Sequence, residues 1–145
     1  MPYKILLLAH RNPTLPPSSF HTYYETHIEL VKRLTGNDFP LSHRRSYIAR
    51  TSTSSISSSS SSSSPPSSDD LNATHPATIL FGQQASFPFD AIAELTFEDR
   101  GAFERFTARV QEPENARLIA EDEERWSDRG RLGIVVLGEV VETRR

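Results

Sequence analysis

The chain has 145 residues and a net charge of −3 with scattered basic residues, which indicates one domain with a modest core and no nucleic-acid-binding patch. It has no cysteine, which excludes disulfides and thiolate chemistry. The apolar run at residues 5–9 is too short to span a membrane and lacks the cleavage pattern of a signal peptide. We therefore expect a soluble cytoplasmic protein with neither a nucleic-acid nor a membrane partner.

In the first half of the chain, the pattern predicts a strand over residues 3–10 and a helix that ends near residue 34. Ser18 or Ser19 can cap this helix, and Gly36-Asn37 stops it. A second strand is expected over residues 42–50. A single domain over residues 1–145 then contains a serine-rich insertion at about 51–76, which has nothing to bury and is predicted to be disordered. We interpret this segment as a tolerated insertion in a surface connection rather than as a phosphorylated or glycosylated, tail-like loop.

In the second half, residues 77–81 form an edge strand or a loop that covers the core. A strand over residues 89–97 alternates, with Asp90, Ile92 and Glu94 on the face opposite the helical core. Asp99 caps the next helix, whose inner face is Ala102, Phe103, Phe106 and Val110. Pro113 begins a third helix with an inward stripe of Leu118, Ile119, Asp122 and Trp126. The last strand is expected over residues 132–141.

The order β-α-β, insertion, β-α-α-β predicts an α+β, ferredoxin-like fold: a four-stranded antiparallel sheet with helices on one face. The uncovered face would carry Ile92, Val135 and Leu137 beside Asp90 and Glu94. Because a small chain does not leave such a face exposed, we expect two sheets to pair in a homodimer, a dimeric α/β barrel that encloses a lumen.

Three motifs follow one another in the chain: Phe20-x-x-Tyr23-Tyr24-x-x-His27 after a strand and a proline-containing loop, the strand FDAIAELTF at residues 89–97, and Glu121-Asp122-Glu123 before Trp126 and Asp128. With these motifs the chain resembles the EthD-like families of dimeric α/β barrel proteins, of the fungal polyketide-pathway type. It departs from the family in having Tyr24 where a tryptophan is common, Trp126 where a phenylalanine is common, and the serine run.

The resemblance implies a homodimer with a pocket in each subunit and chemistry without a cofactor. Fungal members look like dehydratases, decarboxylases or cyclases of aromatic polyketide pathways. Other members are accessory proteins of oxidative degradation, and related barrels include cofactor-free monooxygenases. Fold alone does not choose among these activities.

His27 is the first candidate for chemistry because it lies in the middle of an apolar helical stripe formed by Phe20, Tyr23, Tyr24, His27, Val31 and Leu34. A buried ring needs partners, and histidine exchanges protons near neutral pH. As a general acid or base, it would act on a flat substrate stacked on Phe20, Tyr23 and Tyr24. The alternative is a structural core histidine.

Asp122 is the second candidate. It lies in the inward stripe of the third helix, just as His27 lies in the stripe of the first helix. Pairing with His27 would fix the imidazole tautomer. The alternative is a salt bridge that joins this helix to the sheet through Arg11, Arg44 or Arg45. The aromatic rings of Phe106 and Trp126, on the inner faces of the second and third helices, complete the predicted substrate site.

Further candidates lie on the strands. Glu94 would be a base in the lumen or an interface residue, and His43 shares one strand face with Arg45. If that face is the lumen, His43 is a second acid/base and Arg45 binds an enolate or carboxylate; otherwise both face solvent. No metal-ligand spacing and no glycine-rich phosphate loop occurs, so no metal or nucleotide cofactor is expected.

Together these residues predict a cofactor-independent lyase, a dehydratase or decarboxylase, that acts on an aromatic or polyketide-type compound through His27. The alternatives are a cofactor-free oxygenase of an anthrone-like substrate and an accessory protein that binds aromatic ligands without converting them.

Overall fold

The computed structural model describes residues 1–51 and 75–145, and all but the ends of the predicted serine-rich insertion lies outside these ranges. Within them the longer elements are β1 (Tyr3–Ala9), α1 (Pro17–Thr35), β2 (Ser42–Tyr47), β3 (Ala91–Phe97), α3 (Arg100–Gln111), α4 (Pro113–Trp126) and β4 (Gly133–Val136). Short 3-10 turns add η1 (Gly36–Asp38), η3 (Gln84–Ser86) and η4 (Arg129–Arg131).

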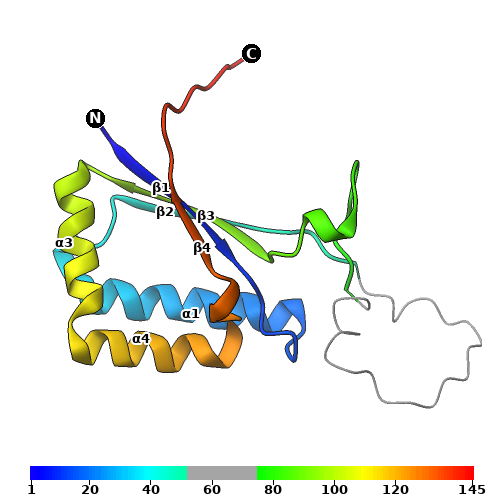
Figure 1. Cartoon of the computed structure of the whole chain (residues 1–145), viewed down its shortest axis with the longest axis horizontal. Helices are drawn as coiled ribbons and strands as arrows, with labels where there is room; N and C mark the ends of the chain where they lie inside the picture. Colours follow the sequence, from blue (N-terminus) through cyan, green and yellow to red (C-terminus); the bar gives the residue numbers. More distant parts are fainter. Residues whose placement is uncertain (52–74) are drawn as a thin grey trace, which may run out of the picture.

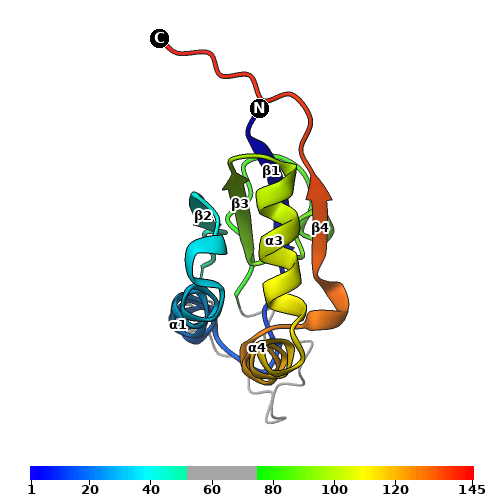
Figure 2. The same cartoon turned by 90° about the vertical axis from the view of Figure 1, so that its left-hand side faces the viewer.

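The strands form one antiparallel sheet in the order β2-β3-β1-β4. Helices α1 and α4 lie side by side below the sheet, and α3 runs across one end of it (Figure 1, Figure 2). The predicted α+β, ferredoxin-like architecture with a four-stranded antiparallel sheet is confirmed. None of the helices in the described parts of the chain has both the length and the apolar character needed to cross a membrane.

The strand register decides which side chains face the helices. Residues directly opposite one another share a face, so Ile5, Ala93 and Leu95 point toward the helices together with Ala91 and Phe97. These side chains are buried and form the core with aromatic residues of the helices. The predicted alternation of this strand is therefore confirmed from residue 91 onward.

The helices in the described residues all lie on one side of the sheet and leave its opposite face open (Figure 2). This open face carries Leu6, Leu8, Ile92, Glu94 and Val135, in agreement with the prediction for residues 92, 94 and 135. The side chain of Val135 is 56% exposed.

Asp90 was expected beside Glu94 on this open face, but the structure buries it. It lies just before β3, and its carboxylate is buried beside two guanidinium groups, 3.1 Å from Nε of Arg11 and 2.7 Å from Nε of Arg50. A carboxylate can be buried at the end of a strand when it is paired with cations, as this one is.

Two helix starts differ in how they are capped. Pro16 occupies the N-cap of α1 without a side-chain cap, so the prediction of a serine cap is wrong; Pro17 suits the first turn because its φ is already helical. Asp99 caps α3 as predicted, since its carboxylate accepts a hydrogen bond of 2.8 Å from the backbone N–H of Ala102.

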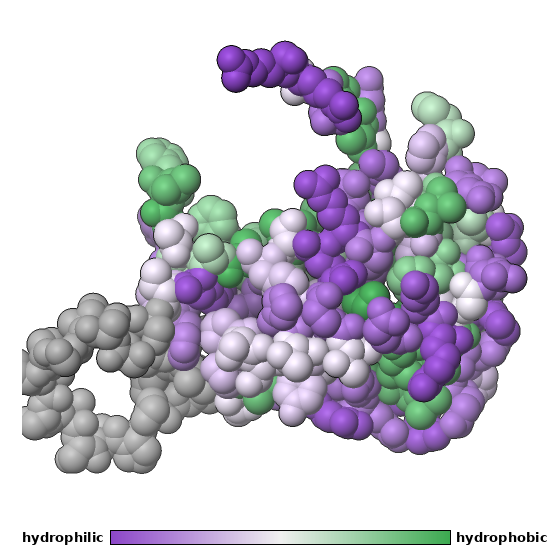
Figure 3. Space-filling model, turned by 180° about the vertical axis from the view of Figure 1, so that it is seen from behind, coloured by the Kyte–Doolittle hydropathy of each residue, from purple (hydrophilic) through white to green (hydrophobic). Residues whose placement is uncertain are grey.

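Two predicted strands end early. Strand β2 stops at Tyr47, and β4 stops at Val136, after which one further hydrogen bond of 2.9 Å joins the Leu137 N–H to the Lys4 carbonyl of β1. Residues 77–81 do not form a strand: Ala77 is buried and makes one isolated bridge, whereas Leu80 and Phe81 are 100% and 93% exposed. Figure 3 shows this apolar loop protruding from the molecule.

Candidate functional site

A cavity of about 330 Å³ lies between the sheet and the three long helices. This volume is in the range of small-molecule sites. Small side chains on the sheet such as Ala9 make room for it, and the apolar lining is completed by Leu7, Ile28, Val31, Phe106, Val110, Ala116, Ile119, Trp126, Leu132 and Ile134. Polar groups enter from Tyr24, His27, His43, Gln111, Glu123, Ser127 and Arg129.

The structure brings His27 and Asp122 together. His27 is buried on α1, and its Nδ1 lies 2.7 Å from Oδ2 of Asp122 on α4. The indole N–H of Trp126 donates to the same carboxylate oxygen over 3.4 Å. Asp122 is therefore positioned to fix the orientation of the imidazole, and this contact takes the place of the expected alternative, a salt bridge to Arg11, Arg44 or Arg45.

A second carboxylate faces the other ring nitrogen. Nε2 of His27 lies 3.3 Å from Oε1 of Glu123, whose other oxygen is 2.8 Å from Nε of Arg129. With Nδ1–H donated to Asp122, Nε2 remains available to exchange a proton with Glu123 or with a ligand in the cavity.

Glu123 was not among the predicted site residues. Successive helical residues are about 100° apart, so a stripe drawn through Asp122 excludes its neighbour. The run Glu121-Asp122-Glu123 was a signal for carboxylates here, but only the position of α4 relative to His27 shows which of them face it.

His43 and Arg45 lie on the helix-facing side of the sheet, which corrects the interpretation that they line a lumen on the other side. His43 is opposite Leu95 and Arg45 is opposite Ala93, two residues of the buried face. His43 lines the cavity. Burial, followed by the nearby Arg45 guanidinium, lowers the pKa of His43 from 6.5 to about 4.

Arg45 does not line the cavity. Its guanidinium donates to both carboxylate oxygens of Glu25, over 2.7 and 2.8 Å. The hydrogen bonds from Arg45 hold the pKa of Glu25 at about 2, opposed by burial and assisted by the Tyr47 hydroxyl. Arg45 thus supports the site from outside.

Glu94 is separated from the other candidates. It projects from the uncovered face, opposite Arg44, and its carboxylate is 3.1 Å from Nζ of Lys4. Since the sheet lies between Glu94 and His27, the two side chains of one chain cannot act on the same ligand.

The predicted aromatic residues divide into two groups. Tyr24, Phe106 and Trp126 line the cavity, and the rings of Tyr24 and Trp126 stack with centroids 4.9 Å apart at 24°. Phe20 is buried beneath these rings in the core rather than in the cavity wall. Tyr23 is 41% exposed, so its predicted place in the site is wrong: α1 turns Tyr24 and Ile28 inward and leaves residue 23 at the edge.

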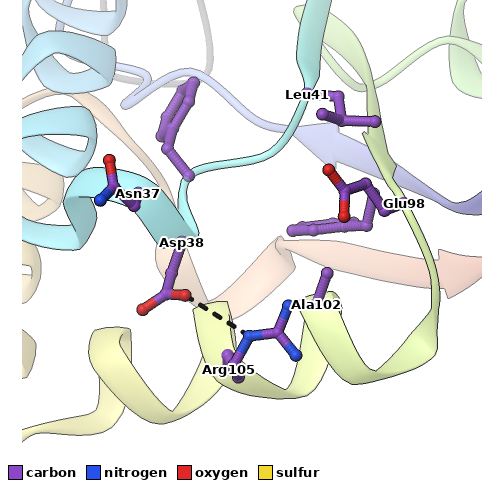
Figure 4. A pocket seen from close by; sticks show the side chains of 8 residues that line it. Asn37, Asp38, Leu41, Glu98, Ala102 and Arg105 are labelled. Atoms are coloured by element: carbon purple, nitrogen blue, oxygen red, sulfur yellow. Dashed lines mark ion pairs between the residues drawn. The ribbon is translucent and has the colours of Figure 1, made fainter.

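A separate hollow of about 60 Å³ lies beside η1 and the start of α3. Figure 4 shows Asn37, Asp38, Leu41, Glu98, Ala102 and Arg105 around it, with an ion pair of 3.6 Å between Asp38 and Arg105. It is too small for a metabolite. Over residues 1–51 and 75–145, no group of three or more histidine, aspartate or glutamate side chains is arranged to hold a metal ion.

A family model for the EthD domain matches residues 12–130. The chain belongs to the EthD domain family. The matched range contains His27, His43, Asp122 and Glu123. No curated protein matches the chain.

Two solved structures share the fold of this EthD domain. A protein from Arabidopsis thaliana has a TM-score of 0.54 at 12% identity, over 98% of this chain and 99% of that one. An EthD family protein from Bacillus halodurans has a TM-score of 0.53 at 13% identity, over 97% of this chain and 100% of that one. At these identities the likeness concerns the fold and carries no information on substrate.

Proposed function

We propose that this EthD domain protein is a cofactor-independent lyase that dehydrates or decarboxylates an aromatic, polyketide-type compound. The observation that carries the proposal is His27: a buried imidazole at the wall of an aromatic cavity, with a carboxylate at each ring nitrogen. Catalytic histidines are commonly oriented by a carboxylate in this way.

The geometry supports an elimination. The stacked rings of Tyr24 and Trp126 offer a flat apolar wall for an aromatic ligand. Nε2 of His27 would take a proton from the carbon next to a carbonyl, the C–H electron pair would form the new double bond, and the C–O bond to the leaving hydroxyl would break. The imidazolium, stabilised by Asp122, then returns the proton to the departing hydroxide, so that water leaves and His27 is restored.

The test compares His27→Ala with His21→Ala, a change at an exposed histidine on the same helix. Aromatic β-hydroxy ketones and β-keto acids are offered to the folded proteins, and loss of substrate and release of carbon dioxide are followed. We expect wild type and His21→Ala to turn over one of these classes, and His27→Ala to lose roughly 10²- to 10⁴-fold in rate. Unchanged turnover in His27→Ala would contradict the assignment, and so would tight binding by wild type without conversion.

The second part of the proposal is the homodimer. The uncovered sheet face presents Leu6, Leu8, Ile92 and the exposed Val135, an apolar surface that a second copy of the chain would cover. Sedimentation of wild type at micromolar concentration should give a dimer, and Leu8→Glu should give a monomer. A monomeric wild type would refute this part without affecting the role proposed for His27.

A further inference from the structure

The tautomer of His43 is fixed by its neighbour. Nη1 of Arg45 lies 3.2 Å from Nδ1 of His43. A guanidinium has donors but no acceptor, so Nδ1 must accept this hydrogen bond. The neutral ring then carries its hydrogen on Nε2. Because Glu25 holds Arg45 through two hydrogen bonds, the donor to Nδ1 is itself fixed in place.

His43 is consequently a donor rather than a base. Its lowered pKa, about 4, keeps the ring neutral at neutral pH. The ring lines the cavity, where its Nε2–H can serve a ligand oxygen.

Tyr24 contributes a second donor. Its side chain lines the cavity and is 3% exposed, and within the described residues its buried hydroxyl has no hydrogen-bond partner. Burial raises its pKa, so the hydroxyl keeps its proton. The ring is held by stacking on Trp126 and by an edge contact to His43 at 6.2 Å. Buried polar groups without a partner are rare, and a ligand acceptor would satisfy this one.

We infer that the Tyr24 hydroxyl and the Nε2–H of His43 form a neutral donor pair that binds the carbonyl oxygen of an aromatic ketone in this cavity. An uncharged oxygen fits better than a carboxylate because both donors are neutral and the nearest cation in the cavity wall, Arg129, is already paired with Glu123. The inference rests on the proposed function in one respect: when His27 removes a proton beside the carbonyl, these donors hold the enolate oxygen. Both then touch the substrate and bind the oxygen on which the negative charge develops.

The test uses acetophenone and ethylbenzene, which have similar shapes but differ in the carbonyl oxygen. Their dissociation constants are measured by ligand-observed NMR with wild type, Tyr24→Phe, His43→Phe and the control Tyr23→Phe. We expect wild type and Tyr23→Phe to prefer acetophenone roughly tenfold, as one or two hydrogen bonds allow. Tyr24→Phe and His43→Phe should each reduce this preference severalfold.

Infrared spectra supply a readout that a purely structural role would not change. The carbonyl stretch of bound acetophenone should lie at lower frequency in wild type than in Tyr24→Phe, because hydrogen bonding weakens the C=O bond. Tyr24→Phe removes a single oxygen and keeps the ring, so it tests the inference even where His43→Phe does not fold. Equal affinity of wild type for both probes, or a preference and stretch unchanged in Tyr24→Phe, would overturn the inference.

The catalytic role proposed for His27 and the donor pair of Tyr24 and His43 can be refuted independently of each other. His27→Ala should lower turnover roughly 10²- to 10⁴-fold and keep the preference for acetophenone, since it removes neither donor. Loss of that preference in His27→Ala would count against a donor pair made by Tyr24 and His43.

Discussion

The neutral, half-buried His43 makes the stability of this protein depend on pH. Its pKa is about 4 in the folded chain and 6.5 as its ordinary value, which we take for the unfolded chain. Below pH 6.5 the unfolded chain binds a proton at this ring that the folded chain does not bind. The free energy of unfolding therefore decreases as the pH is lowered, until the folded ring is also protonated near pH 4. By linkage, this difference removes about 2 kcal/mol between pH 7 and pH 5.

The measurement is urea unfolding at pH 7 and pH 5, followed by the fluorescence of Trp126, the single tryptophan, which is buried in the cavity wall. The variants are His43→Asn, which cannot titrate, and the control His21→Asn at an exposed position. We expect the drop in unfolding free energy from pH 7 to pH 5 to be about 2 kcal/mol smaller in His43→Asn than in the other two proteins.

His10 adds a loss of the same sign, because burial, followed by the charge of Arg131, lowers its pKa too. That loss occurs in all three proteins and cancels in the comparison. If His43→Asn and wild type lose the same free energy between the two pH values, His43 is not held neutral by its surroundings and does not present a fixed Nε2–H donor.

Three further changes test the fold by urea unfolding at pH 7. Asp90→Asn leaves the buried guanidinium groups of Arg11 and Arg50 without their shared carboxylate. It should lower the free energy of unfolding by about 3 to 5 kcal/mol, and a decrease below about 1 kcal/mol would show that this ion cluster is not desolvated. Asp99→Ala removes the cap of α3 and should cost about 1 kcal/mol, with Asp99→Asn restoring most of it. Phe97→Ala empties a fully buried site between the sheet and α3 and should cost about 3 to 5 kcal/mol; a smaller effect would mean that α3 closes over the gap.

The fold was predictable because its signals are local and periodic. Apolar side chains alternate from Ala91 to Phe97, which indicates a strand with one buried face. Asp99 indicates where the next helix begins, because aspartate is a common N-cap. Strand ends were less predictable, since they depend on how far the neighbouring strand extends. Val136 ends β4 within a longer apolar run because β1 begins at Tyr3, so its register leaves the residues after Leu137 almost without a partner.

The site was partly predictable for a related reason. His27 and Asp122 were found because each is an ionisable residue in an apolar helical stripe, and two such stripes packed together bring them into contact. Alternation placed His43 and Arg45 on one face of a strand but could not say which face meets the helices. The answer comes from the register, which places His43 opposite Leu95 and Arg45 opposite Ala93. Register depends on how two strands pair, so the sequence of one strand alone does not reveal it.

The two histidines under the sheet have opposite hydrogen-bonding surroundings, and these suit them to opposite tasks. His27 has carboxylate oxygens at both nitrogens, so an acceptor is in place for an N–H on either one. His43 has a guanidinium at Nδ1, so a proton there would displace that donor and place two cations together. One ring is therefore equipped to carry a proton and the other to donate a hydrogen bond without changing charge. An elimination next to a carbonyl needs one group of each kind.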